Sequence, residues 1–297
     1  MTDRKNYRGI RSKHGIVARP VRPSAAARER YHKSIDNLVK MMGASVLYSV
    51  RAAYGRDDFR SVPKLSKYLS RMNRHWERKF NELAETAPKR FVGSIYKNTL
   101  TQLSMSIKDA KRFPEMAMDA STGRYAKARA SKEMGDVTRS AIKANVSLIK
   151  TISQKFFSDI EFLVYDSVQR GYDVQYLVDE IMAKTDICRE RASLIARDQT
   201  NKITETINAQ QCEDLGITHA VWIHSGGGKK PRESHIKADG KEYEIAEGCY
   251  IDGEYILPGE MINCRCVSRN HDVWGIDQIF YFVSSNFSIY NVVLQFY

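Results

Sequence analysis

The chain has 297 residues, of which 42% are hydrophobic and 28% are charged. These values are typical of globular proteins and exclude a wholly disordered chain, and the length suits about two domains. The formal net charge of +12 is unevenly spread, because residues 1–150 carry about 33 basic and 13 acidic side chains while residues 151–297 carry about 14 and 22. The first half therefore suits a polyanion or an acidic protein surface, and the second half does not.

Residues 1–23 form a basic arm with glycines and prolines and too little apolar content to fold alone. Such an arm binds nucleic acid or an acidic partner by electrostatic attraction, and the alternative is a solvated terminus without a partner. No apolar segment follows the first residues, so we expect no secretory signal. The residues that would make the contact are Arg4, Lys5, Arg8, Arg11, Lys13, Arg19 and Arg22.

Apolar residues recur at spacings of three and four over most of residues 24–215, which predicts a mainly helical body. Ser24 is placed to cap the first helix. Pro63 and Pro88 are expected to begin a second and a third helix, because proline is favoured at the first helical position. The third helix is expected to end at Phe113-Pro114.

Residues 136–170 predict a long helix, with Gly171 as the glycine that follows its C-terminus. A shorter helix over residues 172–183 comes next. Thr185 or Asp186 is then expected to cap a further long helix that ends near Gly216.

After Gly216 the pattern changes to short strands and turns. Residues 219–223 alternate as a strand does, and Asp239-Gly240 indicates a turn. Residues 250–256 predict a hairpin around Asp252-Gly253, because an Asp-Gly pair suits a type I′ turn. The sequence therefore predicts an α+β fold, a mainly helical N-terminal body followed by a small β-rich C-terminal module with hairpins.

Four short motifs in the last third resemble, in order and spacing, those of the Mu F-like phage head morphogenesis family. They are the helix 191–201 (RASLIARDQTN), the PRESH of 231–235, the DGK of 239–241, and a closing LPG and NCRC within 257–266. We expect a structural role for the residues that carry the motifs, together with the strand tryptophan: Arg191, Arg197, Trp222, Arg232, His235, Asp239, Gly240, Pro258, Gly259, Cys264, Arg265 and Cys266.

The resemblance implies a minor head (capsid) protein without enzymatic activity, which acts in head morphogenesis at the portal vertex and in DNA packaging or ejection. It implies the portal protein and other head proteins (major capsid or scaffold) as partners, and double-stranded DNA bound non-specifically. The protein would be in the virion, and in the host cytoplasm during assembly, with no membrane contact.

The motifs suggest a division into a basic arm (1–23), a helical domain (24–185), a head-morphogenesis module (186–269) and a tail (270–297). The tail is aromatic, rich in asparagine and serine and nearly uncharged. Since it resembles nothing in the family, we interpret it as an atypical end, such as an altered gene in a decaying prophage would produce.

The histidines and cysteines of the module allow three interpretations. The favoured one is structural: Arg232, His235 and Asp239 form a polar cluster that holds a loop, while Cys264 and Cys266 lie on opposite faces of a strand. We expect no metal or other cofactor. The alternative is zinc, which needs about four nitrogen or sulfur ligands, here His235, Cys249, Cys264 and Cys266.

The third interpretation is a nuclease or toxin-like enzyme. His224 and His235 would act as acid and base, with Lys230 and Arg232 as the cations that stabilise developing negative charge.

Overall fold

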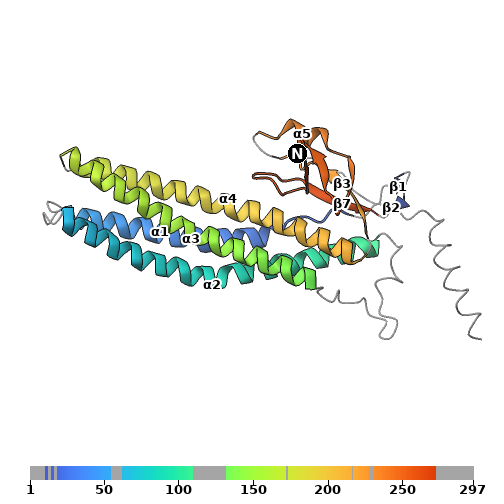
Figure 1. The fold of residues 1–297 in the computed structure, drawn as a ribbon, viewed down its shortest axis with the longest axis horizontal. Coiled ribbons are helices and arrows are strands. Elements are labelled where there is room, and N and C mark those ends of the chain that lie inside the picture. Colours follow the sequence, from blue (N-terminus) through green and yellow to red (C-terminus); the bar gives the residue numbers. More distant parts are fainter. Residues whose placement is uncertain are drawn as a thin grey trace, which may run out of the picture.

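The computed structural model shows four long helices side by side, with a small β-rich module against one end of them (Figure 1). The predicted α+β fold class is confirmed. The structure describes residues 11–12, 15–16, 19–54, 62–109, 132–171, 173–215, 217–227 and 230–271.

The helices are α1 (Ala25–Tyr54), α2 (Val62–Asp109), α3 (Lys132–Gln169) and α4 (Val174–Asp214). Both α1 and α3 pack against α2 and α4, which closes a four-helix bundle. Each helix turns its apolar stripe inward, and the completely buried side chains include Ile35, Phe80, Ile95, Phe156, Ile160, Leu177 and Ile181. No helix among the described residues is long and apolar enough to cross a membrane.

Two of the predicted helix termini are confirmed, the cap at Ser24 and the end at Gly171. The Ser24 hydroxyl accepts a hydrogen bond from the Ala27 N–H, at 3.3 Å, before α1. Gly171 follows α3 with a φ of +80°, in the left-handed region that favours glycine. The predicted ends at Phe113-Pro114 and Gly216 lie outside the described residues.

The predicted start of a helix at Pro88 is wrong, because Pro88 lies inside the continuous helix α2. A proline there lacks the N–H for one helical hydrogen bond. Apolar side chains before and after it, Phe80 and Phe91, are both buried in the same core, so packing holds the helix together through the proline.

The predicted cap at Thr185 or Asp186 is also wrong. The cap lies earlier, at Asp173, whose side chain accepts a hydrogen bond from the Tyr176 N–H. The Thr185 hydroxyl instead donates to the Ile181 carbonyl within α4. The expected domain boundary at 185/186 falls inside this helix, and the division into domains stays a prediction.

The module consists of a three-stranded antiparallel sheet, a hairpin and a short helix. The sheet has the order β4 (Glu242–Glu244), β3 (His219–Ile223) and β7 (Val267–His271). The predicted hairpin is confirmed as β5 (Cys249–Ile251) and β6 (Glu254–Ile256), joined by residues with φ of 53° and 91°. The helix α5 (Glu233–Lys237) follows β3, and a two-stranded ribbon, β1 (Arg11–Ser12) with β2 (Gly15–Ile16), lies in the N-terminal arm.

The module has its own hydrophobic core around the completely buried Trp222. Leu103 of α2 and Val21 of the N-terminal segment also belong to this core. The Gln102 side chain holds that segment by exchanging two hydrogen bonds with the backbone of Arg22, at 2.9 and 2.7 Å. The root of the arm therefore lies at the end of the bundle that carries the module (Figure 1).

A buried polar junction joins α4 to β7. The Glu205 carboxylate accepts hydrogen bonds from the hydroxyl and the backbone N–H of Ser268. The amides of Asn208 and Asn270 pair reciprocally at 2.9 and 3.2 Å. Burial raises the pKa of Glu205 to about 7. Because buried polar groups without partners destabilise a fold by about 1–3 kcal/mol each, these contacts fix where the sheet sits on α4.

The close contact of α1 with α4 at Gly43 can be tested. A Cβ at this position would lie 2.5 Å from the Cγ2 and Oγ1 atoms of Thr185. We expect Gly43→Ala to lower the free energy of unfolding by about 1–3 kcal/mol, as overpacking does. Gly93, on the exposed side of α2, has nothing within 4 Å of its Cβ position, so Gly93→Ala should raise stability by roughly 0.5–1 kcal/mol.

Urea unfolding of both variants measures the difference. Thr185→Ala should recover part of the Gly43→Ala loss, since it removes the two closest atoms. Equal effects of the alanine at positions 43 and 93 would contradict the close contact.

The Glu205 junction predicts a pH dependence of stability. A carboxyl group whose pKa rises from 4.5 to about 7 on folding keeps its proton in the folded state where the unfolded chain has lost it. The free energy of unfolding should therefore fall as pH rises between these values, by up to about 1.4 kcal/mol per pH unit, and level off above pH 7.

Glu205→Gln should remove this slope, whereas Glu213→Gln, at an exposed position on the same helix, should keep it. Urea unfolding at a series of pH values measures both. A slope that survives in Glu205→Gln would show that another group causes it.

Candidate functional site

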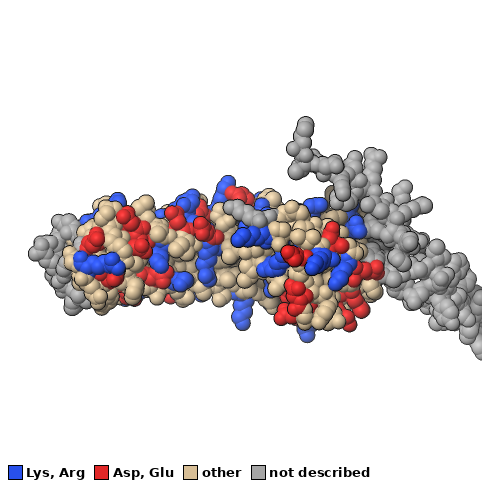
Figure 2. All heavy atoms as spheres, turned by 90° about the horizontal axis from the view of Figure 1, so that it is seen from above, with Lys and Arg blue, Asp and Glu red and all other residues tan. Residues whose placement is uncertain are grey.

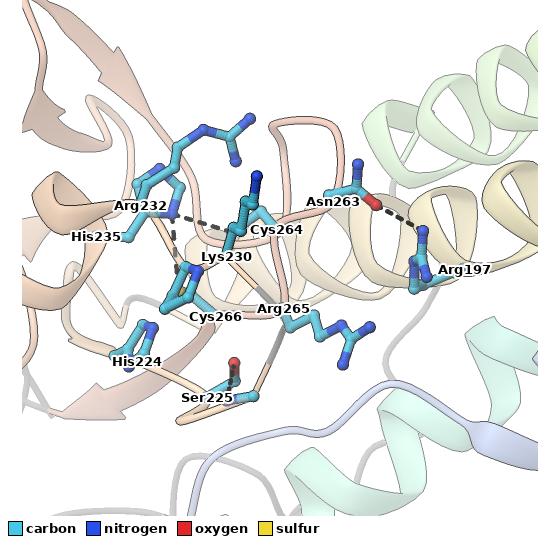
Figure 3. Close-up of a pocket in the computed structure, with 12 residues that line it drawn as sticks. Arg197, His224, Ser225, Lys230, Arg232, His235, Asn263, Cys264, Arg265 and Cys266 are labelled. Carbon is cyan, nitrogen blue, oxygen red and sulfur yellow. Dashed lines mark hydrogen bonds between the residues drawn. The ribbon is translucent and has the colours of Figure 1, made fainter.

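A cavity of about 590 Å³ lies in the module, beside the start of α5 and the segment that leads into β7 (Figure 3). His224 and Ser225 line it at the end of β3, and Arg197 reaches it from α4. The other lining residues are Gly227, Lys230, Pro231, Arg232, His235, Asn263, Cys264, Arg265 and Cys266.

Three buried side chains converge at the wall of this cavity. The Nδ1 atom of His235 lies 3.4 Å from the sulfur of Cys264 and 3.8 Å from the sulfur of Cys266 (Figure 3). All three ligand atoms lie within 4.8 Å of one another, and each residue is 3–4% exposed. We call these three residues the His-Cys-Cys cluster.

The backbone explains why both cysteines face the histidine. Asn263 has a φ of 63°, and the Cys264 N–H donates to the Met261 carbonyl at 2.9 Å, so the chain turns immediately before Cys264. Regular pairing begins only at Val267. The expected arrangement, with Cys264 and Cys266 on opposite faces of a strand, is therefore wrong: the pair lies in the approach to β7, where strand alternation does not apply.

The motif helix positions this turn directly. The Arg197 guanidinium donates to the Asn263 side chain, and the Asp198 carboxylate accepts from the Asn263 N–H at 3.1 Å. The Asn201 amide donates to the Cys264 carbonyl at 2.7 Å. Three hydrogen bonds thus join two motifs that lie more than 60 residues apart in sequence.

Gly259 brings a further donor to Cys264. Its N–H lies 3.3 Å from the Cys264 sulfur. Its φ is +79°, and a Cβ there would approach the Asn201 backbone to 3.3 Å. Glycine is therefore required twice, for the turn and for the close approach to α4, and Pro258 beside it is buried.

Arg232, His235 and Asp239 do not form the expected single cluster but make separate contacts. Arg232 donates to the Ile262 carbonyl at 3.1 Å, and Asp239 accepts from the His224 N–H at 2.8 Å. His235 contacts the two sulfurs and packs edge-on against Trp222, with ring centroids 5.2 Å apart.

Gly240 and Arg191, two further motif residues, lie away from the His-Cys-Cys cluster. The Gly240 N–H donates to the Trp222 carbonyl, which closes the turn after α5. Arg191 faces the bundle instead of the module, where its guanidinium donates to the Thr151 hydroxyl at 3.3 Å.

The electrostatics of the cluster favour one thiolate. The Cys266 thiol donates a hydrogen bond to the Cys264 sulfur, which lowers the pKa of Cys264 and raises that of Cys266. His235 also favours the Cys264 thiolate, and its own Nε2 atom has no hydrogen-bond partner among the described residues. Cys249, in the expected ligand set, is buried in β5 and is not part of the group.

The four residues of the nuclease hypothesis, His224, Lys230, Arg232 and His235, all line the cavity. Arg197 and Arg265 line it as well, although the sequence analysis did not include them in the nuclease hypothesis. No carboxylate is among the lining residues that the structure describes. The cavity wall is therefore cationic, and the buried His-Cys-Cys cluster forms part of it.

Only part of the predicted basic arm can be placed. Arg19 and Arg22 are exposed next to the C-terminal part of α2. Arg11 belongs to the β1–β2 ribbon, and its side chain lies outside the description. Arg4, Lys5, Arg8 and Lys13 lie outside the described residues.

Sequence reasoning missed Asp198, Asn201, Asn263 and Glu205 as positioning residues. The first two stand in the motif helix, and Asn263 directly precedes the cysteine pair. For Asp198 and Asn201, a polar side chain next to apolar positions of a helix was the available signal. Glu205 gave no signal, since its partner Ser268 is defined only by the fold.

The fold and the site define an α+β protein in which a four-helix bundle and a small cysteine-containing module share one long helix. Residues 158–269 match the model of the family described as Phage Mu protein F like protein. The match confirms the resemblance and covers the end of α3, all of α4 and the module as far as Arg269.

A relative is found in Haemophilus influenzae (strain ATCC 51907 / DSM 11121 / KW20 / Rd), where its description is "Uncharacterized protein". It is 26% identical over 254 residues, which cover 84% of this chain and 54% of the relative. The chain thus spans about half the length of that protein. No solved structure matches the chain.

Proposed function

We propose that the protein is a phage minor head protein that acts in head morphogenesis at the portal vertex. The observation that carries the proposal is the match of residues 158–269 to the Mu F-like family, whose two most distant motifs meet at the Asn263–Cys264 turn. These motif residues brace one another and the backbone. In this proposal the protein is a structural component of the head, and His235 packs against Trp222 in the module core.

The module also offers a surface for other head proteins. Tyr250 and Tyr255 project from the β5–β6 hairpin with exposed fractions of 56% and 61%, and their rings are 5.1 Å apart. Exposed paired tyrosines suit a protein interface, because they contribute large contact areas at low conformational cost. We infer that this hairpin contacts the portal protein or a neighbouring head protein.

The proposal predicts that the chain is found in phage heads. Mass spectrometry of heads from the phage that encodes it should detect the chain at a small number of copies relative to the major capsid protein. Tyr250→Ser with Tyr255→Ser should reduce its capture by portal or scaffold protein in a pull-down. Tyr48→Ser with Tyr165→Ser, which changes two exposed tyrosines of the bundle, should not.

Absence of the chain from purified heads would contradict the proposal. Hydrolysis of RNA or DNA by the full chain, abolished in His224→Ala with the fold intact, would favour the nuclease instead. The four residues of the nuclease hypothesis all line the cavity.

We further propose that the basic arm binds packaged DNA non-specifically. The basic excess of residues 1–150 is unevenly distributed. The arm carries seven basic residues and one acidic residue, whereas the helices carry residues of both signs. Figure 2 shows Lys and Arg interspersed with Asp and Glu along one face of the bundle. The arm is therefore a segment whose positive charge has little internal compensation.

The arm should make DNA binding strongly salt-dependent. We expect the affinity of the full chain for duplex DNA to fall steeply with salt, and Arg4→Gln, Lys5→Gln and Arg8→Gln together to reduce the log–log slope by up to about 0.9 per lost phosphate contact. The control is Arg71→Gln, Arg74→Gln and Arg78→Gln, at exposed positions on α2. Affinity that does not change with salt would contradict DNA binding, and capture by acidic scaffold alone would assign the arm to protein.

A further inference from the structure

The His-Cys-Cys cluster has the dimensions of a metal site. In a tetrahedral zinc site with Zn–S bonds of about 2.3 Å and Zn–N bonds of about 2.0 Å, nitrogen and sulfur ligands lie about 3.5 Å apart. The Nδ1 atom of His235 lies 3.4 and 3.8 Å from the two sulfurs. An ion can therefore be placed between the three atoms without moving any of them far.

The ligand types select the metal. Two cysteine sulfurs and one imidazole nitrogen suit zinc, whereas magnesium and calcium need carboxylate and carbonyl oxygens. No carboxylate is among the described residues that line the cavity. Two thiolates also neutralise the charge of a zinc ion, so the complex would be electrically neutral beside Lys230, Arg232 and Arg265.

The surroundings hold the ligands in place before any ion arrives. The Gly259 N–H donates to the Cys264 sulfur, and the Asn201 amide holds the Cys264 carbonyl. Trp222 packs against the His235 ring. Outer contacts of this kind orient metal ligands and contribute to affinity.

From this geometry we propose that the module binds one zinc ion through His235 Nδ1, Cys264 Sγ and Cys266 Sγ, with the fourth position open to the cavity. Water or an anionic group occupies that fourth position, because the cavity is wide and its wall is cationic. The ion would tie α5 to the segment before β7, two elements about 30 residues apart that no strand pairing joins.

Metal analysis of the tag-free full chain, purified under reducing conditions, tests the site. We expect one zinc per chain, and on replacement by cobalt a thiolate-to-cobalt charge-transfer band. Cys264→Ser and Cys266→Ser should weaken zinc binding by more than about 100-fold, which exceeds the effect of losing an outer contact. Cys249→Ser and Cys188→Ser, which change buried cysteines outside the cluster, should bind as the unchanged chain does.

His224→Ala tests the open position, because His224 is the other histidine that lines the cavity. Unchanged zinc affinity in this variant is expected, and loss of zinc would overturn the open fourth position. A folded, unchanged chain that takes up neither zinc nor cobalt would overturn the site itself, as would equal losses in Cys249→Ser and Cys266→Ser.

The unchanged chain gives a second measurement that does not depend on the folding of variants. Removing zinc with a chelator should lower the melting temperature, and adding zinc back should restore it. A melting temperature that is the same with and without the metal would contradict a role for the ion in holding the module together. Neither result depends on whether the chain assembles into phage heads.

Discussion

The structure depends on α4 serving two cores at once. Its N-terminal part packs against α1 and α3 through Leu177, Ile181 and Ala192, as an ordinary bundle helix does. Its last turns carry polar residues that are buried, above all Glu205 and Asn208, and these pair with β7. Since each buried polar group must find its partner, the sheet has one satisfactory position on the helix. Apolar packing alone would tolerate sliding, and the polar junction does not.

Sequence patterns located most elements, because apolar periodicity and turn residues act locally. Ser24, Gly171 and Asp252-Gly253 each satisfy a backbone requirement within a few residues, and each was identified correctly. Pro88 and Thr185 led to wrong predictions because the prediction relied on local signals alone. Both carry local signals for a helix start, but buried residues on each side continue the stripe, and tertiary packing outweighs the local preference.

The site was only partly predictable, for a physical reason. The motifs identified His235, Cys264 and Cys266, yet nothing local indicates that a Cys-x-Cys pair leaves the strand geometry. That depends on Asn263 at positive φ and on the contacts that Asp198 and Asn201 make from α4. The spacing of the cysteines therefore suggested opposite faces, whereas the fold brings both sulfurs to one imidazole. Cys249 was an equal candidate by residue type and is excluded only by its place in β5.

The arrangement also places the cavity and the root of the basic arm in one module. The arm enters beside α2, where Gln102 and Ser106 hold its backbone, and Val21 is buried in the module core. The cationic cavity lies in the same module. A shift of the module on α4 would therefore move the arm's root as well, since both rest on one hydrophobic core. Glu205 and Asn208, which fix the module on α4, thereby also fix the position of the arm's root.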